Sequence, residues 1–302
     1  MEQSITIRQI ATDRFQLVFR ASNRTDLRIL QITDTHFGIP EPGHVEKDQK
    51  TFRAIEGVVA RERPDFIVHT GDFVNNDKPG AVWDAVDFMN SLGLSWKLIL
   101  GNHDVGSTPE CLTTEEYRKK LENAAFGYFD RGGCREYAFR LDVLLHDEKT
   151  PRLTLFCFDS GHTKPLLHVS DSQREWFGEE LERDRSEGVD CPCLAMIHVP
   201  VVEFHQLVES GEYDGCFGEK VWYETDTGKT FAALKSAERV RAVFSGHDHK
   251  NDYHGVWDGI ELVYGRCTGW GGYGDCERGG RLIEVDLETG AYKHRVVAPP
   301  RS

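Results

Sequence analysis

The stretch Leu27-Arg28-Ile29-Leu30-Gln31-Ile32-Thr33-Asp34-Thr35-His36 joins an apolar run to two polar side chains that are able to bind a metal. The apolar residues 27–32 have the length and composition of a buried strand. Asp34 and His36 follow that strand directly. Because binding sites in α/β proteins collect beyond the carboxyl ends of strands, these two side chains are predicted to belong to a functional site.

The same arrangement, an apolar run followed by a short polar motif, recurs four times further along the chain. These motifs are Gly71-Asp72, Gly101-Asn102-His103-Asp104, His198 and Gly246-His247-Asp248-His249. One such motif alone is more often a turn or a core histidine, but five in series are poorly explained in that way. Carboxylate, amide and imidazole groups suit divalent transition metals, and a metal pair activates water for attack on phosphorus. The series therefore predicts an enzyme.

Helical patterns separate the apolar runs, which predicts an α/β fold with crossover helices. A surface loop or insertion is expected over 209–230. No repeat or linker divides the chain, and the motifs extend over residues 34–249, so one domain over residues 1–302 is expected. The expected helices are 48–62, 80–92 and 172–187, and the expected strands are 27–32, 65–69, 96–100, 137–145, 153–158, 194–198, 240–244, 252–256, 260–264, 281–285 and 292–296.

Composition makes some classes of partner less favourable. The 302 residues carry a formal charge of −14, which disfavours binding to nucleic acid and to anionic membranes.

Neither a signal core nor a transmembrane run is visible, so a cytoplasmic protein is expected. Eight cysteines in a long chain without a secretion signal predict free thiols rather than disulfides. The Cys191-Pro192-Cys193 spacing is unsuited to a structural zinc site.

The motifs resemble those of the calcineurin-like metallophosphoesterase superfamily over about residues 27–287. The C-terminal half is similar to non-purple relatives that are filed with plant and fungal purple acid phosphatases. That similarity rests on His198-Val199-Pro200, Gly218-Glu219, the stretch from Gly246 to Asp252, and residues 264–274. The resemblance implies a four-layer α/β/β/α sandwich of two mixed sheets flanked by helices, with the metals at its edge.

The resemblance also implies a role for each motif residue. One metal is held by Asp34, His36 and His249, a second by Asn102, His198 and His247, and Asp72 bridges the two. The implied cofactors are two divalent or mixed-valence ions, Mn, Fe or Zn, which acidify a bridging water that becomes the nucleophile. His103 binds no metal and protonates the leaving oxygen.

Two departures narrow the resemblance. Purple enzymes resemble one another in a tyrosine three residues after the bridging aspartate, where this chain has Asn75, and they lack a histidine equivalent to His36. The Ser/Thr protein phosphatases share a Gly-Asp-x-x-Asp-Arg-Gly motif that residues 71–77 do not match. The chain is therefore expected not to be a purple, tyrosinate-coloured protein, and Asn75 is similar to the branches that act on small phosphomonoesters and phosphodiesters.

The expected function is hydrolysis of a small phosphomonoester or phosphodiester. The alternatives are a cyclic-nucleotide or lipid-type phosphodiesterase, and a catalytically weak regulatory binding protein on the same scaffold. The oligomeric state is left open. Trp270 and Tyr273 are either loop packing or an aromatic wall for the leaving group. Among other histidines, His69 is expected in the core and His294 at the surface, while His162 and His205 are weaker candidates for the pocket.

Overall fold

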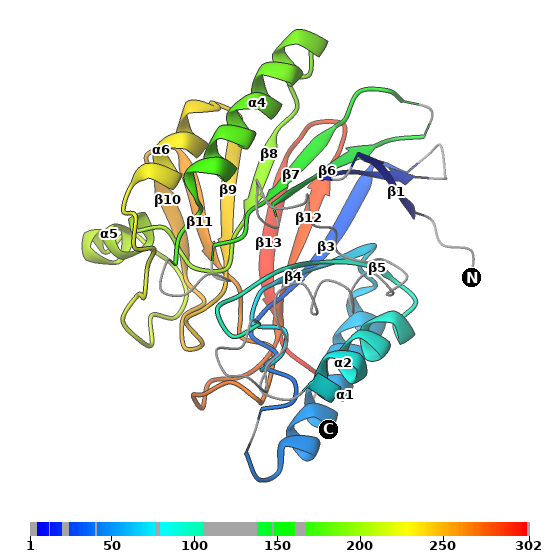
Figure 1. The fold of residues 1–302 in the computed structure, drawn as a ribbon, viewed down its shortest axis with the longest axis vertical. Coiled ribbons are helices and arrows are strands. Elements are labelled where there is room, and N and C mark those ends of the chain that lie inside the picture. Colours follow the sequence, from blue (N-terminus) through cyan, green and yellow to red (C-terminus); the bar gives the residue numbers. More distant parts are fainter. Residues whose placement is uncertain are drawn as a thin grey trace.

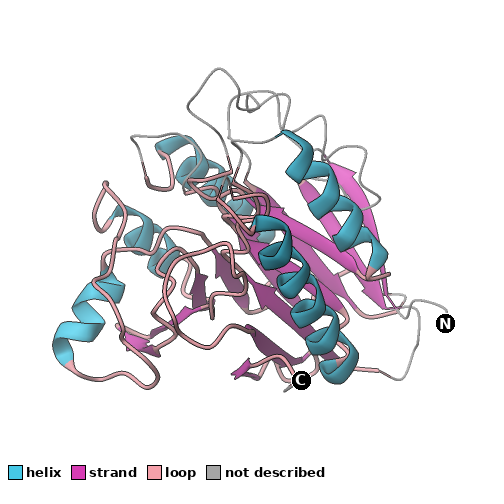
Figure 2. Ribbon diagram, turned by 90° about the horizontal axis from the view of Figure 1, so that it is seen from below, coloured by secondary structure: helices cyan, strands magenta, loops and turns pink. Residues whose placement is uncertain are grey.

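The fold is described from a computed structural model of the chain. Two β-sheets lie face to face, and helices cover the outer side of each (Figures 1 and 2). The residues that the structure describes are 5–11, 13–19, 24–39, 41–75, 79–104, 138–146, 148–160 and 167–300.

The five-stranded sheet has the strand order β13-β12-β3-β4-β5. Strands β3, β4 and β5 are parallel, and the helices α1 and α2 make the crossovers between them, as the alternating pattern predicts. Strand β12 runs antiparallel to both β3 and β13. The bounds are β3 (Asp26–Ile32), α1 (His44–Glu62), β4 (Phe66–Thr70), α2 (Pro79–Ser91), β5 (Ser95–Ile99), β12 (Gly280–Asp286) and β13 (Tyr292–Val297).

The eight-stranded sheet has the order β1-β2-β6-β7-β8-β9-β11-β10. Its central strands β7, β8 and β9 are parallel, so their carboxyl ends lie at one edge. The bounds are β1 (Ile5–Ala11), β2 (Arg14–Phe19), β6 (Phe139–Leu144), β7 (Leu153–Cys157), α4 (Asp171–Glu187), β8 (Cys193–Met196), α5 (Glu203–Ser210), α6 (Lys229–Ser236), β9 (Val240–Ser245), β10 (His254–Trp257) and β11 (Ile260–Tyr264).

Alternating side chains show how the layers pack. On β8, Leu194 and Met196 join the core between the two sheets. Cys193 and Ala195 point the other way, into a second core that also contains Trp176 of α4. Strands with both faces buried are typical of a sheet covered on both sides. The α/β/β/α sandwich that the resemblance implies is therefore confirmed.

The expected elements match the structure to within a few residues, and the differences lie in short elements. The β1–β2 hairpin was not predicted from the sequence. Residues 211–228 form a loop as expected, but the eight-residue helices α5 and α6 flank it. Each is too short to show a clear 3.6-residue repeat. Strand β10 begins at His254 rather than at residue 252.

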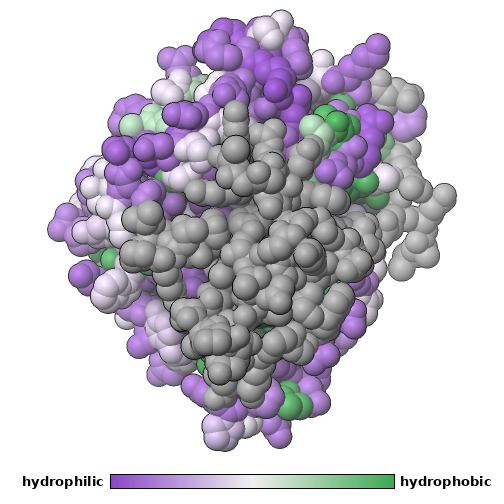
Figure 3. Space-filling view, in the orientation of Figure 1, coloured by the Kyte–Doolittle hydropathy of each residue, from purple (hydrophilic) through white to green (hydrophobic). Residues whose placement is uncertain are grey.

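The helices, the surface and the cysteines can be compared with what the sequence predicts. None of the helices that the structure describes is both long and apolar enough to cross a bilayer. The end of α4 at the top of Figure 3 is strongly hydrophilic. The six described cysteines are free thiols, as predicted, while Cys111 and Cys134 lie outside the described residues. Cys191 and Cys193 are both buried.

Candidate metal centre

The five polar motifs meet at the carboxyl ends of strands from both sheets. Strands β3, β4 and β5 deliver the motifs at residues 34–36, 72 and 102–104, and β8 and β9 deliver His198 and residues 247–249. All seven predicted ligands lie in one cluster. Ligand atoms lie within 4.8 Å of one another in two groups that share one residue, namely Asp34, His36, Asp72 and His249, and Asp72, His198 and His247. The seventh residue, Asn102, places its Oδ1 3.2 Å from His198 Nε2.

Asp72 stands between the two groups. Its Oδ2 lies 3.5 Å from His36 Nε2, and its Oδ1 lies 3.3 Å from His198 Nε2. Each carboxylate oxygen therefore faces a different half of the cluster. Asp72 is 1% exposed, so its negative charge is screened by protein groups rather than by bulk water.

Burial and neighbouring charges set the protonation of the cluster. Burial opposes ionisation of Asp72, but the charge and hydrogen bond of His198 bring its pKa well below the usual range. Burial also opposes a charge on His198, yet Asp72 and Asp34 raise its pKa to about 10. Burial lowers the pKa of His36 and of His247 to about 3, so both imidazoles are neutral. Burial likewise opposes a charge on His249, but its hydrogen bond with Asp34 raises the pKa of this histidine. His198 and His249 are thus the histidines of the cluster that the carboxylates help to hold a proton.

These donors fit a pair of cations. His247 Nδ1 is buried and makes no hydrogen bond to any residue that the structure describes. The Nε2 atoms of His36 and His249 face each other at 3.1 Å. Neutral imidazoles and ionised carboxylates are the forms that bind metal, and binding would displace the proton held by His198. Mixed oxygen and nitrogen donors suit Mn, Fe and Zn.

Four residues of the cluster have strained backbone. The φ angles are 54° for Asp34, 48° for His36, 52° for Asp72 and 83° for His247. Aspartate and histidine adopt this left-handed region more often than most residues other than glycine, but each instance still costs about 1–3 kcal/mol. Backbone hydrogen bonds hold the first of these turns, since Asp34 N donates to Gly71 O and His36 N donates to Asp72 O, both at 3.0 Å.

His103 and Asp104 differ in what they do at the end of β5. The His103 side chain is exposed, and its ring centroid lies 5.1 Å from that of His36. Its backbone N–H donates to Asp72 Oδ1 at 2.8 Å. Asp104 is fully buried, and its carboxylate accepts from Gly101 N at 2.7 Å and from Val74 N at 2.9 Å. Asp104 therefore fixes the loops that carry Asn102 and Asp72, a role that the sequence does not reveal.

A cavity of about 510 Å³ opens beside the cluster. His36, Asp72, His247 and His249 line it together with His103. Apolar and aromatic lining residues include Ile39, Leu167, Trp222 and Tyr273. Cavities of this size hold small organic ligands.

The aromatic wall differs from the sequence prediction in one member. Tyr273 lines the cavity, but Trp270 is absent from its described lining. Lys50 Nζ lies 4.5 Å above the centroid of the Trp270 ring, and Trp270 N donates to Thr51 Oγ1 at 3.1 Å, so this residue packs on α1. The second aromatic residue is Trp222, which lies in the 211–228 loop, where the sequence has no periodic pattern that indicates its direction.

The other histidines have structural roles where they are described. His69 is buried, with Nε2 2.9 Å from Thr35 Oγ1, which confirms a core position. His205 stacks on Tyr223 at 5.6 Å and is absent from the described lining of the cavity. His162 lies outside the described residues.

A third group, His254, Glu261 and His294, also has ligand-type atoms close together. His294 is partly buried rather than an ordinary surface residue, and its side chain is 5% exposed. The Arg281 guanidinium can only donate, so His294 Nδ1 accepts from it at 2.9 Å and Nε2 keeps the ring proton. That proton is donated to Glu261 Oε1 at 3.0 Å. Nε2 of His294 therefore carries a proton, so it has no free lone pair with which to bind a metal.

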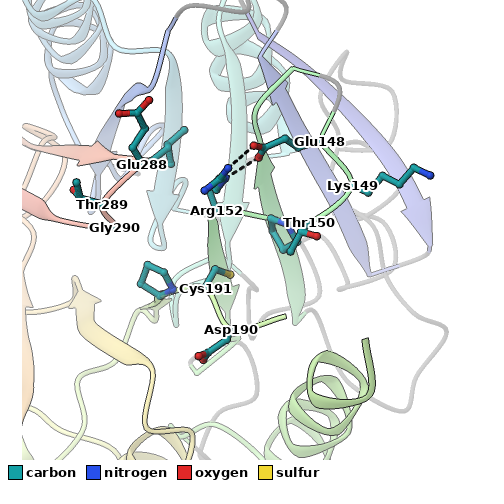
Figure 4. Close-up of a pocket in the computed structure, with 12 residues that line it drawn as sticks. Glu148, Lys149, Thr150, Arg152, Asp190, Cys191, Glu288, Thr289 and Gly290 are labelled. Atoms are coloured by element: carbon teal, nitrogen blue, oxygen red, sulfur yellow. Dashed lines mark hydrogen bonds and ion pairs between the residues drawn. The ribbon is translucent and has the colours of Figure 1, made fainter. Parts of the chain in front are cut away.

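A second cavity of about 550 Å³ lies at the opposite ends of the strands, between the segments that precede β7 and β8 and the β12–β13 turn. Figure 4 shows Arg152 directed at Glu148, and Arg152 Nε donates to Glu148 Oε2 at 2.7 Å. Lys149 points away from this pair in the same view. Its labelled acidic and basic groups do not converge on one point, so this cavity does not resemble a catalytic site.

Gly101→Ala is expected to disrupt the centre. A Cβ at this position would lie 2.3 Å from both the backbone N and Oδ1 of Asp72, so the aspartate has to shift. We expect a loss of metal binding and of about 2 kcal/mol in the free energy of unfolding. Urea denaturation and metal analysis measure the two effects.

Gly178→Ala in α4 is the matched control, because a Cβ there meets no described atom within 4 Å. Alanine is the better helix former, so this variant should gain about 0.5–1 kcal/mol and keep its metals. Equal behaviour of the two variants would contradict the close approach at Gly101.

The chain is similar to several known proteins. The Calcineurin-like phosphoesterase family model matches residues 27–251. "Probable inactive purple acid phosphatase 29" of Arabidopsis thaliana is 28% identical, with 89% of this chain and 79% of that protein covered. "Serine/threonine-protein phosphatase CPPED1" of Mus musculus is 24% identical, with 88% and 82% covered. The crystal structure of a dimetal phosphatase from Danio rerio matches this chain with a TM-score of 0.59 at 14% identity. The match covers 89% of this chain and 96% of that one. At this identity it shows that the two folds are alike and nothing more.

Proposed function

Because the chain belongs to the Calcineurin-like phosphoesterase family, we propose that it is a two-metal phosphoesterase that hydrolyses a small phosphomonoester or phosphodiester. The observation that carries this proposal is the position of Asp72. Its two carboxylate oxygens face His36 and His198, in different halves of the ligand cluster, at 3.5 Å and 3.3 Å. A carboxylate so placed is suited to bridging two cations.

The ligand residues divide into two sets around this bridge. Asp34, His36 and His249 would hold one cation, and Asn102, His198 and His247 the other. Bound divalent cations such as Mn, Fe or Zn would supply an activated water and neutralise charge on the phosphoryl oxygens. The chain's own groups contribute orientation, since Asp104 fixes the loops of Asn102 and Asp72 through two backbone N–H groups.

His103 is the proposed proton donor to the leaving oxygen. Its side chain lines the cavity and is exposed, while its backbone N–H is bonded to Asp72. The ring is therefore held next to the cluster without being buried in it. A positioned imidazole is suited to protonating an ester oxygen as the bond to phosphorus breaks.

The size of the cavity favours a small substrate. A volume of about 510 Å³ accommodates a phosphate with one modest organic group. The formal charge of −14 supports the proposal that nucleic acid and membrane surfaces are not the partners. A cyclic-nucleotide or lipid-type diester fits the same chemistry and remains the alternative within this class.

Metal analysis together with a turnover screen tests the proposal. The protein, loaded with Mn²⁺, Fe²⁺ or Zn²⁺ in turn, is expected to retain two ions per chain and to hydrolyse some of a panel of phosphomonoesters and phosphodiesters. Chelation should abolish turnover, and the metal should restore it. Metal binding without turnover of any ester would favour the regulatory binding protein, and failure to bind metal would overturn the proposal.

A further inference from the structure

Trp222 is an exposed aromatic residue at the cavity beside the metal cluster. Its side chain is 61% exposed, although large aromatic side chains usually bury most of their surface. It lines the same cavity as Asp72 and His103. An exposed indole in a site of this kind offers a flat apolar face to whatever group the phosphate carries.

The backbone of Trp222 is fixed to the ligand loops. Trp222 N donates to Asp248 Oδ2 at 3.1 Å, and the same oxygen accepts from Tyr264 OH at 2.6 Å. Asp248 is buried and stands between His247 and His249 in the sequence. A partly buried hydrogen bond therefore sets the position of the Trp222 backbone relative to the candidate metal ligands.

Tyr273 supplies a second preformed aromatic surface. Its ring stacks on His249 with centroids 4.0 Å apart, and its OH donates to Glu219 Oε1 at 2.9 Å. The preceding Gly272 allows this contact, because a Cβ there would lie 2.5 Å from the His249 ring. Ile39 and Leu167 add apolar surface to the same cavity.

Two lysine side chains lie near these rings. Lys47 lines the cavity, but its Nζ is paired with Glu41 Oε2 at 2.7 Å. Lys220 Nζ lies 5.1 Å from the centroid of the Trp222 ring and so lies over the indole. The wall thus offers aromatic and apolar surface beside the metal cluster, which suits a planar aromatic group carried by the phosphate.

We propose that Trp222 is a specificity-determining residue that binds a planar aromatic leaving group of the phosphoester. The inference rests on the proposed function for its chemistry, but the binding surface exists independently of turnover. The phosphoryl group lies at the ligand cluster, His103 faces the leaving oxygen, and the aromatic group extends over the indole. Loss of such a stacking surface typically weakens binding on the order of tenfold.

Paired ligands and paired variants test this assignment. Phenyl phosphate and methyl phosphate are compared by kcat/KM, and phenylphosphonate and methylphosphonate, which cannot be hydrolysed, are compared by calorimetric titration of the metal-loaded protein. Trp222→Ala should reduce the phenyl-to-methyl ratio on the order of tenfold in both measurements. Trp222→Phe should restore most of the ratio. Trp270→Ala is the matched control, because that indole packs on α1 outside the cavity, and it should keep the wild-type ratio.

The outcomes separate this inference from the proposed function. Equal binding of the two phosphonates by the wild type would overturn the inference, whether or not esters are hydrolysed. A Trp222→Ala variant that loses both ligands alike would also overturn it, because that result indicates a displaced Asp248 loop. If the wild type prefers phenylphosphonate through Trp222 yet hydrolyses no ester, the inference stands and the proposed function fails.

Discussion

Asp72→Asn is expected to weaken the binding of both metals and to lose about a thousandfold in turnover. The carboxylate faces both halves of the cluster, so one substitution removes the negative charge shared by both sites. The fold should survive, because asparagine tolerates the left-handed φ of 52° at this position. Its side-chain oxygen is also able to accept the hydrogen bond from His103 N.

Metal content per chain and the circular dichroism spectrum of the variant check this prediction. Asp34→Asn is the comparison, because Asp34 Oδ1 lies 3.4 Å from His249 Nε2 and belongs to one of the two groups. It should lower the occupancy of mainly one ion. An Asp72→Asn protein with two ions and full turnover would refute the bridging assignment.

His103→Ala is expected to keep both metals and to lose on the order of 10²–10⁴ in the rate of alkyl ester hydrolysis. The side chain lines the cavity but is absent from both ligand groups. The loss should be much smaller for p-nitrophenyl esters, because p-nitrophenolate leaves without a proton.

Steady-state rates on an alkyl phosphate and on p-nitrophenyl phosphate, normalised to metal content, separate these cases. His205→Ala serves as the control, since that ring stacks on Tyr223 outside the described lining of the cavity. Equal losses on both esters would exclude protonation of the leaving group and leave His103 with a role in substrate binding.

The cluster of candidate ligands was predictable because each motif follows an apolar strand that is evident in the sequence. Residues 27–32 predict a strand, and β3 ends at Ile32, two residues before Asp34. The four-layer sandwich, by contrast, was predicted from the family resemblance. Pairing of β2 with β6, which places Arg14 beside Arg140, joins residues too distant in sequence for any local pattern to indicate. The assignment of residues 1–302 to one domain stays a prediction.

The parts that were missed depend on tertiary contacts. Asp104 looks like a turn residue until its carboxylate is seen to accept two backbone N–H groups. The sequence alone cannot decide whether Trp222 or Trp270 lines the cavity, since both tryptophans lie in loops. The hydrogen bond from Trp222 N to Asp248 and the packing of Trp270 on α1 decide between them.

The left-handed backbone at Asp34, His36, Asp72 and His247 bears on how this chain has been shaped by selection. Glycine at any of these positions would relax the turn, but it would also remove a polar side chain that the buried cluster uses. Some relatives carry names that include the word inactive. If the proposed function is right, the energy stored in these turns measures what this chain gives up in stability to place its metal ligands.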